Sequence, residues 1–212
     1  MMPQEILKFI VDRFKLDLSQ PNPIRIRIRR WNDVGPMLND LDFKKAVEIG
    51  VYKGKFTETI ASQVPDMKLY GVDAWTFYDG YKDYPPGNLE EVGYPQAIAR
   101  AEKYPNIELI KGWSKDVAPT FEDGSLDFMF LDANHTYPCV KEDLELWVKK
   151  VKEGGIVMGH DYFDTDNSRR FKNLEFGVIQ AVNEWVMEHN IAHLFATHDS
   201  YPSWFFVQGD IK

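Results

Sequence analysis

Polar and titratable side chains follow several short apolar runs in this chain of 212 residues. Acids, histidines and hydroxyls can transfer protons, hold a metal ion or bind the polar edges of a nucleoside. If the apolar runs are parallel strands, their carboxyl ends meet along one edge of a sheet, where ligands of such sheets bind. The residues at these ends are Glu48, Gly50, Asp73, Ala74, Trp75, Trp113, Ser114, Asp132, His135, His160 and Asp161.

Residues 46–57 predict a strand, a tight turn and a helix. A β-branched apolar run ends at Gly50, and apolar residues at four-residue spacing begin at Phe56. Gly50 permits a sharp turn, Gly54 permits close approach of a ligand or of the sheet, and the N–H groups at a helix start favour negative charge. Glu48 is an unusual group to bury without a hydrogen-bonding partner. The turn fits a nucleoside-cofactor site, but the same spacing also occurs in ordinary βα turns.

The next two strand ends supply candidate nucleoside contacts. Asp73 ends the strand after the turn, where an acid can accept both ribose hydroxyls or can simply be hydrated. Trp75 and Trp113 flank the expected adenine position, and each either borders the adenine or belongs to the core. Ser114 can bond an adenine edge, cap the following helix, or do both.

The last two strand ends carry the candidate reaction chemistry. His135 follows Asp132 by three residues, and an imidazole titrates near neutrality, so His135 is the candidate general base. His135 can alternatively cap the next helix or pack on Tyr137. Asp132, His160 and Asp161 are the candidate ligands of a divalent cation such as Mg²⁺. Acids that orient His135 and a substrate without any metal are the competing interpretation.

Patterns of strand and helix alternate from residue 44 onward. This alternation predicts a Rossmann-like, doubly wound, mainly parallel α/β sheet. A hairpin formed by the apolar runs 191–197 and 203–208 makes the C-terminal strand antiparallel and brings the sheet to seven strands. The other strands are expected at 45–50, 68–73, 106–111, 126–131 and 155–159, and helices at 55–64, 93–104, 115–121, 138–151 and 174–189.

Residues 1–43 are expected to form an N-terminal extension to a domain at 44–212. Apolar spacing predicts an amphipathic helix at 4–16. Residues 24–31 alternate isoleucine with arginine, which predicts a strand whose basic face either docks an acidic partner or protects an exposed sheet edge. Asn32 or Asp33 can cap a short helix that leads to Leu41. The first helix and the strand are candidate contacts of a homo-oligomer.

Two segments, 75–92 and 162–173, have no periodicity and are expected to form the substrate pocket. The first is rich in aromatic residues and is either a lid or an insertion that packs on the outside. The second contains the basic cluster at 169–172, which fits an anionic substrate group or a solvated loop.

Composition disfavours several classes of protein. Hydrophobic residues make up 44% of the chain, which predicts a globular protein. The formal net charge of −8 is unfavourable for a general phosphate-backbone binder, so no nucleic-acid partner is expected. Cys139 is the single cysteine, and no signal peptide or membrane span is expected, so the sequence predicts a cytoplasmic protein without a membrane partner. Cys139 is expected to pack rather than to act as a nucleophile.

The combined motifs point to one family. The turn Glu48-x-Gly50-x-x-x-Gly54 has Tyr52 where a dinucleotide site often has its second glycine. With Asp-x-x-His-x-Tyr beginning at Asp132 and Gly-Gly followed by His-Asp at 160–161, the chain resembles the class I S-adenosylmethionine-dependent methyltransferases. It looks most similar to the small-molecule O-methyltransferases that carry these motifs. The resemblance covers about residues 44–208, and the antiparallel seventh strand of that fold matches the predicted hairpin.

The resemblance implies S-adenosylmethionine as cofactor and a role for each strand end. The turn after the first strand of the domain would hold the amino-acid end of the cofactor, and the next strand end would hold its ribose. Asp132 would lie near the methyl-transfer site. The implied cofactor contacts are Glu48, Gly50, Tyr52 and Gly54 at the amino-acid end, Asp73 with Ala74 and Trp75 at the ribose, and Trp113 and Ser114 at the adenine.

The sequence therefore predicts O-methylation of a small-molecule hydroxyl, of sugar or natural-product type by analogy. Because a fold does not fix a function, two alternatives stand beside it. A nicotinamide-dependent oxidoreductase is disfavoured by the pattern of the turn. A non-catalytic protein of the same fold, which binds a cofactor or a partner, is disfavoured by the titratable groups at the strand ends.

Overall fold

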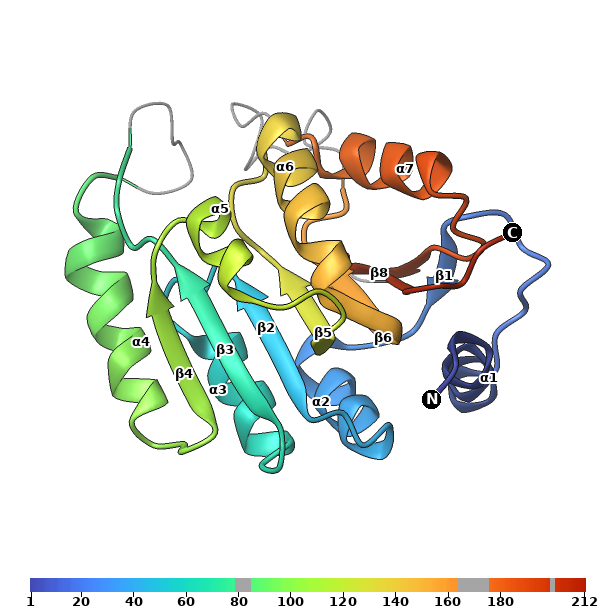
Figure 1. Ribbon diagram of the computed structural model, residues 1–212, viewed down its shortest axis with the longest axis horizontal. Helices are drawn as coiled ribbons and strands as arrows, with labels where there is room; N and C mark the ends of the chain where they lie inside the picture. Colours follow the sequence, from blue (N-terminus) through green and yellow to red (C-terminus); the bar gives the residue numbers. More distant parts are fainter. Residues whose placement is uncertain (79–84, 164–175, 199–200) are drawn as a thin grey trace.

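One mixed sheet forms the centre of the protein in the computed structural model, which describes residues 1–78, 85–163, 176–198 and 201–212. Within these residues the sheet has eight strands in the order β1-β7-β8-β6-β5-β2-β3-β4 (Figure 1). The predicted mainly parallel α/β fold is confirmed, with one strand more than the seven expected. The strands are β1 (Ile24–Ile26), β2 (Lys45–Ile49), β3 (Lys68–Asp73), β4 (Ile107–Lys111), β5 (Leu126–Leu131), β6 (Val151–Gly159), β7 (Phe195–Thr197) and β8 (Trp204–Val207).

The order of the strands reverses at β2. This strand pairs in parallel with both β3 and β5, so the chain builds outward through β3 and β4 and then returns to the other side of β2. The boundary between β2 and β5 is therefore the switch point at which sheets of this kind bind ligands. β8 pairs antiparallel with β6 and β7, which confirms the predicted hairpin and its antiparallel strand.

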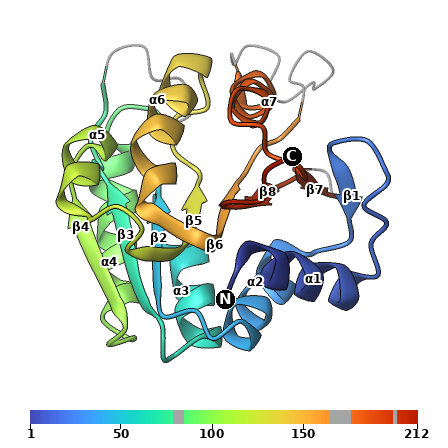
Figure 2. The ribbon, with the colours of Figure 1, turned by 45° about the vertical axis from the view of Figure 1, so that its right-hand side comes forward.

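Helices cover both faces of the sheet (Figures 1 and 2). One apolar core joins the sheet to α5, α6 and α7, and a second core joins the opposite face to α1, α2 and α3. α4 packs beside α3 at the β4 edge. The helices are α1 (Pro3–Phe14), α2 (Arg30–Asp40), α3 (Lys55–Gln63), α4 (Tyr94–Ala101), α5 (Ser114–Val117), α6 (Tyr137–Trp147) and α7 (Val178–Glu188). Short helical turns occupy Asn88–Gly93, Ala118–Thr120 and Val148–Lys150.

The isoleucine–arginine alternation continues as a strand for only part of the predicted range 24–31. Ile24–Ile26 forms β1, which pairs in parallel with β7 at the edge of the sheet. Arg30 is already the first residue of α2, whose N-cap is Arg29 rather than Asn32 or Asp33. Asp33 instead accepts the backbone N–H of Arg29 at 2.7 Å. The strand is shorter than predicted because this carboxylate stabilises a helix start within the alternating run.

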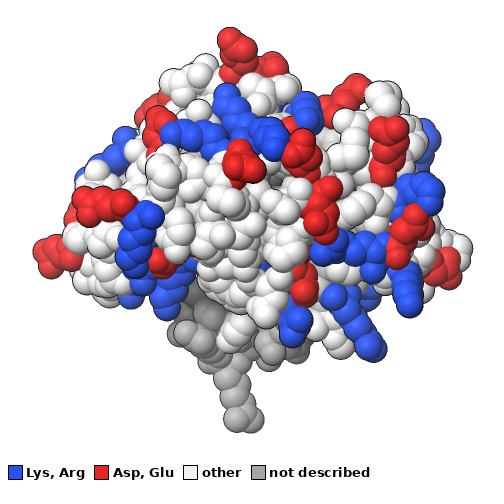
Figure 3. Space-filling view, turned by 90° about the horizontal axis from the view of Figure 1, so that it is seen from below, with Lys and Arg blue, Asp and Glu red and all other residues white. Residues whose placement is uncertain are grey.

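Figure 3 shows the molecule from the side on which the N-terminal ends of the central strands lie. On this face, lysine and arginine side chains are interspersed with aspartate and glutamate side chains. Among the described residues, no helix is long and apolar enough to cross a membrane. Parts of the segments predicted to form the substrate pocket, 79–84 and 164–175, lie outside the described residues.

Candidate functional site

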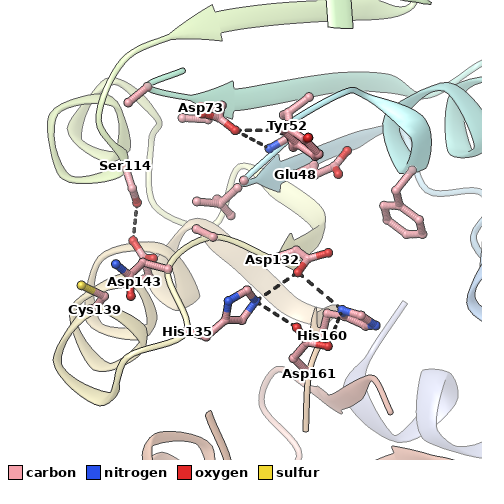
Figure 4. Close-up of a pocket in the computed structure, with 18 of the residues that line it drawn as sticks. Glu48, Tyr52, Asp73, Ser114, Asp132, His135, Cys139, Asp143, His160 and Asp161 are labelled. Atoms are coloured by element: carbon pink, nitrogen blue, oxygen red, sulfur yellow. Dashed lines mark hydrogen bonds and ion pairs between the residues drawn. The ribbon is translucent and has the colours of Figure 1, made fainter. Parts of the chain in front are cut away.

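A cavity of about 1100 Å³ opens at the carboxyl ends of β2, β3, β5 and β6 (Figure 4). Two predicted cofactor contacts do not line it: Gly54 packs against Ala97, and the Trp75 side chain is fully buried against Tyr94. The other predicted site residues do line it, namely Glu48, Gly50, Tyr52, Asp73, Ala74, Trp113, Ser114, Asp132, His135, His160 and Asp161.

Asp73 holds the turn that follows β2. Its Oδ2 accepts the backbone N–H groups of Val51 and Tyr52 at 2.9 and 2.8 Å, and its Oδ1 accepts the N–H of Trp75 at 2.7 Å. Burial raises the pKa of Asp73, and these three donors oppose that rise. The acid predicted to bind a ribose therefore also orders the turn, which the sequence pattern did not reveal.

Gly50 brings the turn into contact with the end of β5. Its φ angle of 90° lies in the left-handed region. A Cβ atom at this position would lie 2.2 Å from the carbonyl oxygen of Asp132. Only glycine fits so close to Asp132. The turn and the loop after β5 therefore lie in direct contact, and both line the cavity.

Glu48 is buried beneath the same turn, with 3% of its surface exposed. Its carboxyl accepts a hydrogen bond from the Thr57 hydroxyl on α3. Burial raises the pKa of Glu48 to about 8, although the hydrogen bond from Thr57 opposes the rise. Because this carboxyl also lines the cavity, it can bind a cationic group there and ionise when that group arrives.

Ser114 belongs to a partly buried chain of hydrogen bonds and does not cap a helix. Its hydroxyl donates to the Asp143 carboxyl of α6 and accepts the indole N–H of Trp147 at 2.7 Å. α5 begins at Ser114, with Trp113 as its N-cap, so the predicted capping role is not observed. Asp143 also lines the cavity, but the sequence reasoning missed it because it lies on the apolar-patterned face of a helix.

Four titratable side chains meet at the ends of β5 and β6 (Figure 4). His135 Nε2 lies 3.4 Å from Asp132 Oδ1 and 3.2 Å from Asp161 Oδ2. His160 Nδ1 lies 2.9 Å from Asp161 Oδ1 and 3.5 Å from Asp132 Oδ1. Each carboxylate is therefore shared by both imidazoles.

These contacts set the charges of the cluster. Burial raises the pKa of Asp132, but the charges and hydrogen bonds of His160 and His135 outweigh it and hold the pKa well below its usual range. Burial lowers the pKa of His160, but Asp132 and Asp161 outweigh it and raise the pKa to about 9. At neutral pH the arrangement favours an anionic Asp132 beside a cationic His160.

Part of the cluster is suited to a metal ion. Asp132, His135 and Asp161 each offer one ligand atom, and these atoms lie within 4.8 Å of one another. The ligand set expected from the sequence had His160 in the place of His135. His160 Nδ1 also lies 3.5 and 2.9 Å from oxygens of the same two acids, and the His135 ring stacks on Phe176 with ring centroids 4.5 Å apart. α6 is capped at Thr136, so His135 does not cap it.

Arg30 is a cavity residue that the sequence reasoning also missed. Its Nη1 lies 3.4 Å from Asp132 Oδ2, and its guanidinium lies 4.8 Å from the ring centroid of Trp31. The alternating pattern had placed this arginine within a strand over 24–31. The first turn of α2 instead directs it toward the end of β5.

The remaining predictions concern residues around the site. Cys139 is half-buried and lines the cavity. Trp113 lies at the cavity rim, is 40% exposed, and meets Tyr78 edge-on. The basic cluster at 169–172 lies outside the described residues. Away from the cavity, His193 Nδ1 lies 2.9 Å from Asp210 Oδ2.

A parallel sheet with this strand order, an antiparallel β8 and a cavity at the switch point defines the class I methyltransferase fold. Solved O-methyltransferases have a similar fold. TomG from Streptomyces achromogenes, solved in complex with S-adenosylmethionine, gives a TM-score of 0.60 at 15% identity and covers 99% of this chain and 92% of that one. An O-methyltransferase from Bacillus cereus, solved with S-adenosylhomocysteine, gives a TM-score of 0.60 at 14% identity, with 97% and 90% covered.

A family model described as a methyltransferase domain matches residues 47–162. The chain belongs to this methyltransferase-domain family, which confirms the class predicted from the sequence. A curated relative, the tRNA (guanine-N(7)-)-methyltransferase of Streptococcus pyogenes, is 26% identical over 152 residues, which are 68% of this chain and 62% of that protein. The chain spans 15% to 62% of the length of the first curated relatives that it matches.

Proposed function

We propose that this protein transfers the methyl group of S-adenosylmethionine to a hydroxyl of a small molecule of sugar or natural-product type. The observation that carries the proposal is that the turn held by Asp73 and the cluster around Asp132 open into one cavity. When bound, S-adenosylmethionine supplies an electrophilic methyl group on its sulfonium. The solved relatives TomG and the Bacillus cereus protein are O-methyltransferases, which supports an oxygen acceptor.

The residues that line the cavity fit this cofactor. Glu48 offers a carboxyl to the α-ammonium group, and Asp73 lies where the ribose is expected. Ser114 and Asp143 offer polar atoms to an adenine edge. The volume of about 1100 Å³ exceeds that of many single-ligand pockets, so it suits a cofactor together with a small acceptor.

His135 is the proposed general base. A hydroxyl is a weak nucleophile until its proton leaves, and a positioned imidazole can accept that proton near neutral pH. The carboxylates of Asp132 and Asp161, 3.4 and 3.2 Å from His135 Nε2, stabilise the imidazolium that forms. They also fix the orientation of the ring, which Phe176 supports from one face.

Asp132 and Asp161 are also the proposed ligands of a divalent cation. Two carboxylates with one imidazole supply oxygen and nitrogen ligands for a divalent cation, and the imidazole comes from His135 or from His160. A bound cation would lower the pKa of an acceptor hydroxyl, and His135 would then share or yield its role as base.

Cofactor binding tests the first part of the proposal. Calorimetry is expected to show micromolar binding of S-adenosylhomocysteine and no binding of NAD. Asp73→Asn removes the charge and one acceptor oxygen, so it is expected to weaken binding by roughly 1–3 kcal/mol. Asp66→Asn, at an exposed position away from the cavity, is the matched control. Absence of S-adenosylhomocysteine binding by the wild-type protein would overturn the proposal.

Methyl transfer to a panel of acceptors tests the second part. Labelled methyl groups are expected on hydroxyl compounds such as sugars, glycosides and phenols. Unfractionated tRNA belongs in the panel because a curated relative is a tRNA methyltransferase. Transfer to tRNA without transfer to any hydroxyl compound would contradict the small-molecule acceptor and leave the cofactor assignment intact.

A further inference from the structure

Arg30 is the most enclosed side chain among the lysines and arginines of the described cavity wall. Its side chain is 16% exposed, whereas Lys55 and Lys115 are exposed and Lys53 lies over the Tyr52 ring at the cavity mouth. A charge so enclosed is costly to keep unless it has an anionic partner. Asp132 Oδ2, 3.4 Å from Arg30 Nη1, is one such partner, and the position of Arg30 on the cavity wall leaves it accessible to a second, bound in the cavity.

The neighbours of Arg30 place it over the boundary between β2 and β5. Its guanidinium carbon lies 5.8 Å from the ring centroids of both Phe56 and Phe130. Phe130 pairs in register with Glu48, and alternate residues of a strand share a face. Arg30 and Glu48 therefore project on the same side of the sheet, whereas α5 and α6, which carry Ser114 and Asp143, cover the opposite face.

Arg30 uses little of its hydrogen-bonding capacity within the protein. Among the described residues it makes one hydrogen bond, to Asp132, and that bond is long at 3.4 Å. A guanidinium is planar and presents several N–H donors that match a carboxylate in a bidentate pair. The stacked aromatic rings hold this group in place while donors remain for a ligand.

We propose that Arg30 binds the α-carboxylate of the methionine part of S-adenosylmethionine, while Glu48 binds its α-ammonium. This inference rests on the proposed function. An amino acid in its zwitterionic form needs one anionic and one cationic partner, and Glu48 and Arg30 supply them from the same side of the sheet. The start of α2 thereby becomes part of the cofactor site.

Calorimetry with a pair of ligands tests this assignment. Decarboxylated S-adenosylhomocysteine retains the nucleoside and the ammonium group and lacks only the carboxylate. Arg30→Met is expected to weaken binding of S-adenosylhomocysteine by roughly ten- to a hundredfold and binding of the decarboxylated ligand by less than about twofold. Arg30→Lys keeps the positive charge but lacks the planar guanidinium, so its affinity for S-adenosylhomocysteine is expected to lie between those of wild type and Arg30→Met. If Arg30→Met does not fold, the same comparison of the two ligands is made with Arg30→Lys.

Arg29→Met is the matched control, because the Arg29 side chain is 76% exposed. It is expected to leave both affinities unchanged. Equal weakening of both ligands by Arg30→Met, or unchanged binding of S-adenosylhomocysteine, would overturn the carboxylate assignment while wild-type binding still supports the proposed function. A wild-type protein that binds neither ligand would overturn both.

Discussion

Glu48 and Asp132 are acids at the ends of neighbouring strands, and their pKa values move in opposite directions. Burial raises the pKa of both, but Asp132 has two imidazoles beside it, whereas the hydrogen-bond donor to Glu48 is the neutral hydroxyl of Thr57. The pKa of Glu48 therefore rises to about 8, and that of Asp132 falls. Partner charge, rather than residue type or position, decides which acid is ionised before a ligand arrives.

Glu48 makes the stability of the protein depend on pH. Its pKa of about 8 in the folded protein lies above the usual value of 4.5, so between these values the folded state keeps a proton that the unfolded chain has lost. Stability from this group is therefore present at low pH and lost as pH rises, by at most about 1.4 kcal/mol per pH unit. Glu48→Gln keeps the shape without the titration. In urea unfolding, the free energy of unfolding of Glu48→Gln is expected to increase relative to that of wild type from pH 5 to pH 8, whereas the exposed control Glu122→Gln is expected to follow wild type. A constant difference between Glu48→Gln and wild type over this pH range would contradict the prediction.

His135 is expected to affect turnover far more than cofactor affinity. Removal of a general base typically costs about 10²–10⁴ in rate, so His135→Gln should lower kcat within that range. The affinity for S-adenosylhomocysteine, measured by calorimetry, should change little. His198→Gln, at an exposed histidine, is the control and should retain wild-type kcat. Loss of cofactor binding with retained kcat would make His135 a structural residue.

At the scale of elements, the turn between β2 and α3 is the piece that joins the two halves of the site. Asp73 orders it by accepting the two backbone N–H groups of Val51 and Tyr52, and Gly50 packs it against the loop after β5. α2 contributes at its first residue, where Arg30 reaches the same strand end. Short segments at element ends therefore carry the candidate site residues, and the sheet fixes their spacing.

Gly50→Ala tests the contact between the turn and β5. Gly124 is a matched position: its φ is 68°, but a Cβ there would meet its nearest atom only at 4.0 Å. Gly124→Ala should therefore cost only the backbone strain of roughly 1–2 kcal/mol. Gly50→Ala adds a clash with the Asp132 carbonyl and should cost at least about 1 kcal/mol more in urea unfolding. Equal losses in the two variants would show that the turn can move away from β5.

At the scale of the whole molecule, the acid–histidine cluster exists only because two strands and a loop converge. β5 and β6 pair in parallel up to Leu131 and Gly159, so the residues that follow them leave the sheet side by side. The approach of α7 holds the loop after β5, since Gly177 donates its N–H to the His135 carbonyl at 2.7 Å. The cluster is thus a product of sheet order and helix packing together.

A cation bound by this cluster should link activity to the stability of the whole fold. EDTA is expected to abolish methyl transfer, and added Mg²⁺ is expected to restore it. Because a ligand of the folded state raises its stability by mass action, Mg²⁺ should also raise the Tm of the EDTA-treated protein. Asp161→Asn should remove both responses. Turnover that is indifferent to EDTA would remove the cation from the proposal and leave proton transfer to His135.

The sequence by itself determined the order of the elements and the class of protein. Apolar runs located β2, β3, β4, β5 and β6, and the turn at Gly50 with the motif at Asp132 indicated a methyltransferase. These features are local, because the periodicity of apolar residues, the turn residues and the acids at strand ends can all be identified along the chain. The strand ends therefore predicted a common site before any contact was known.

Only the tertiary structure decided which side chains meet. It excluded Trp75 from the cavity wall, brought in Arg30 and Asp143, and placed His135 as well as His160 beside the two acids. Sequence spacing could not give these results, because each depends on contacts between segments far apart in the chain. Packing sets the helix start at Arg30, the helix face that carries Asp143 and the stacking of His135 on Phe176. The local sequence pattern does not encode such packing.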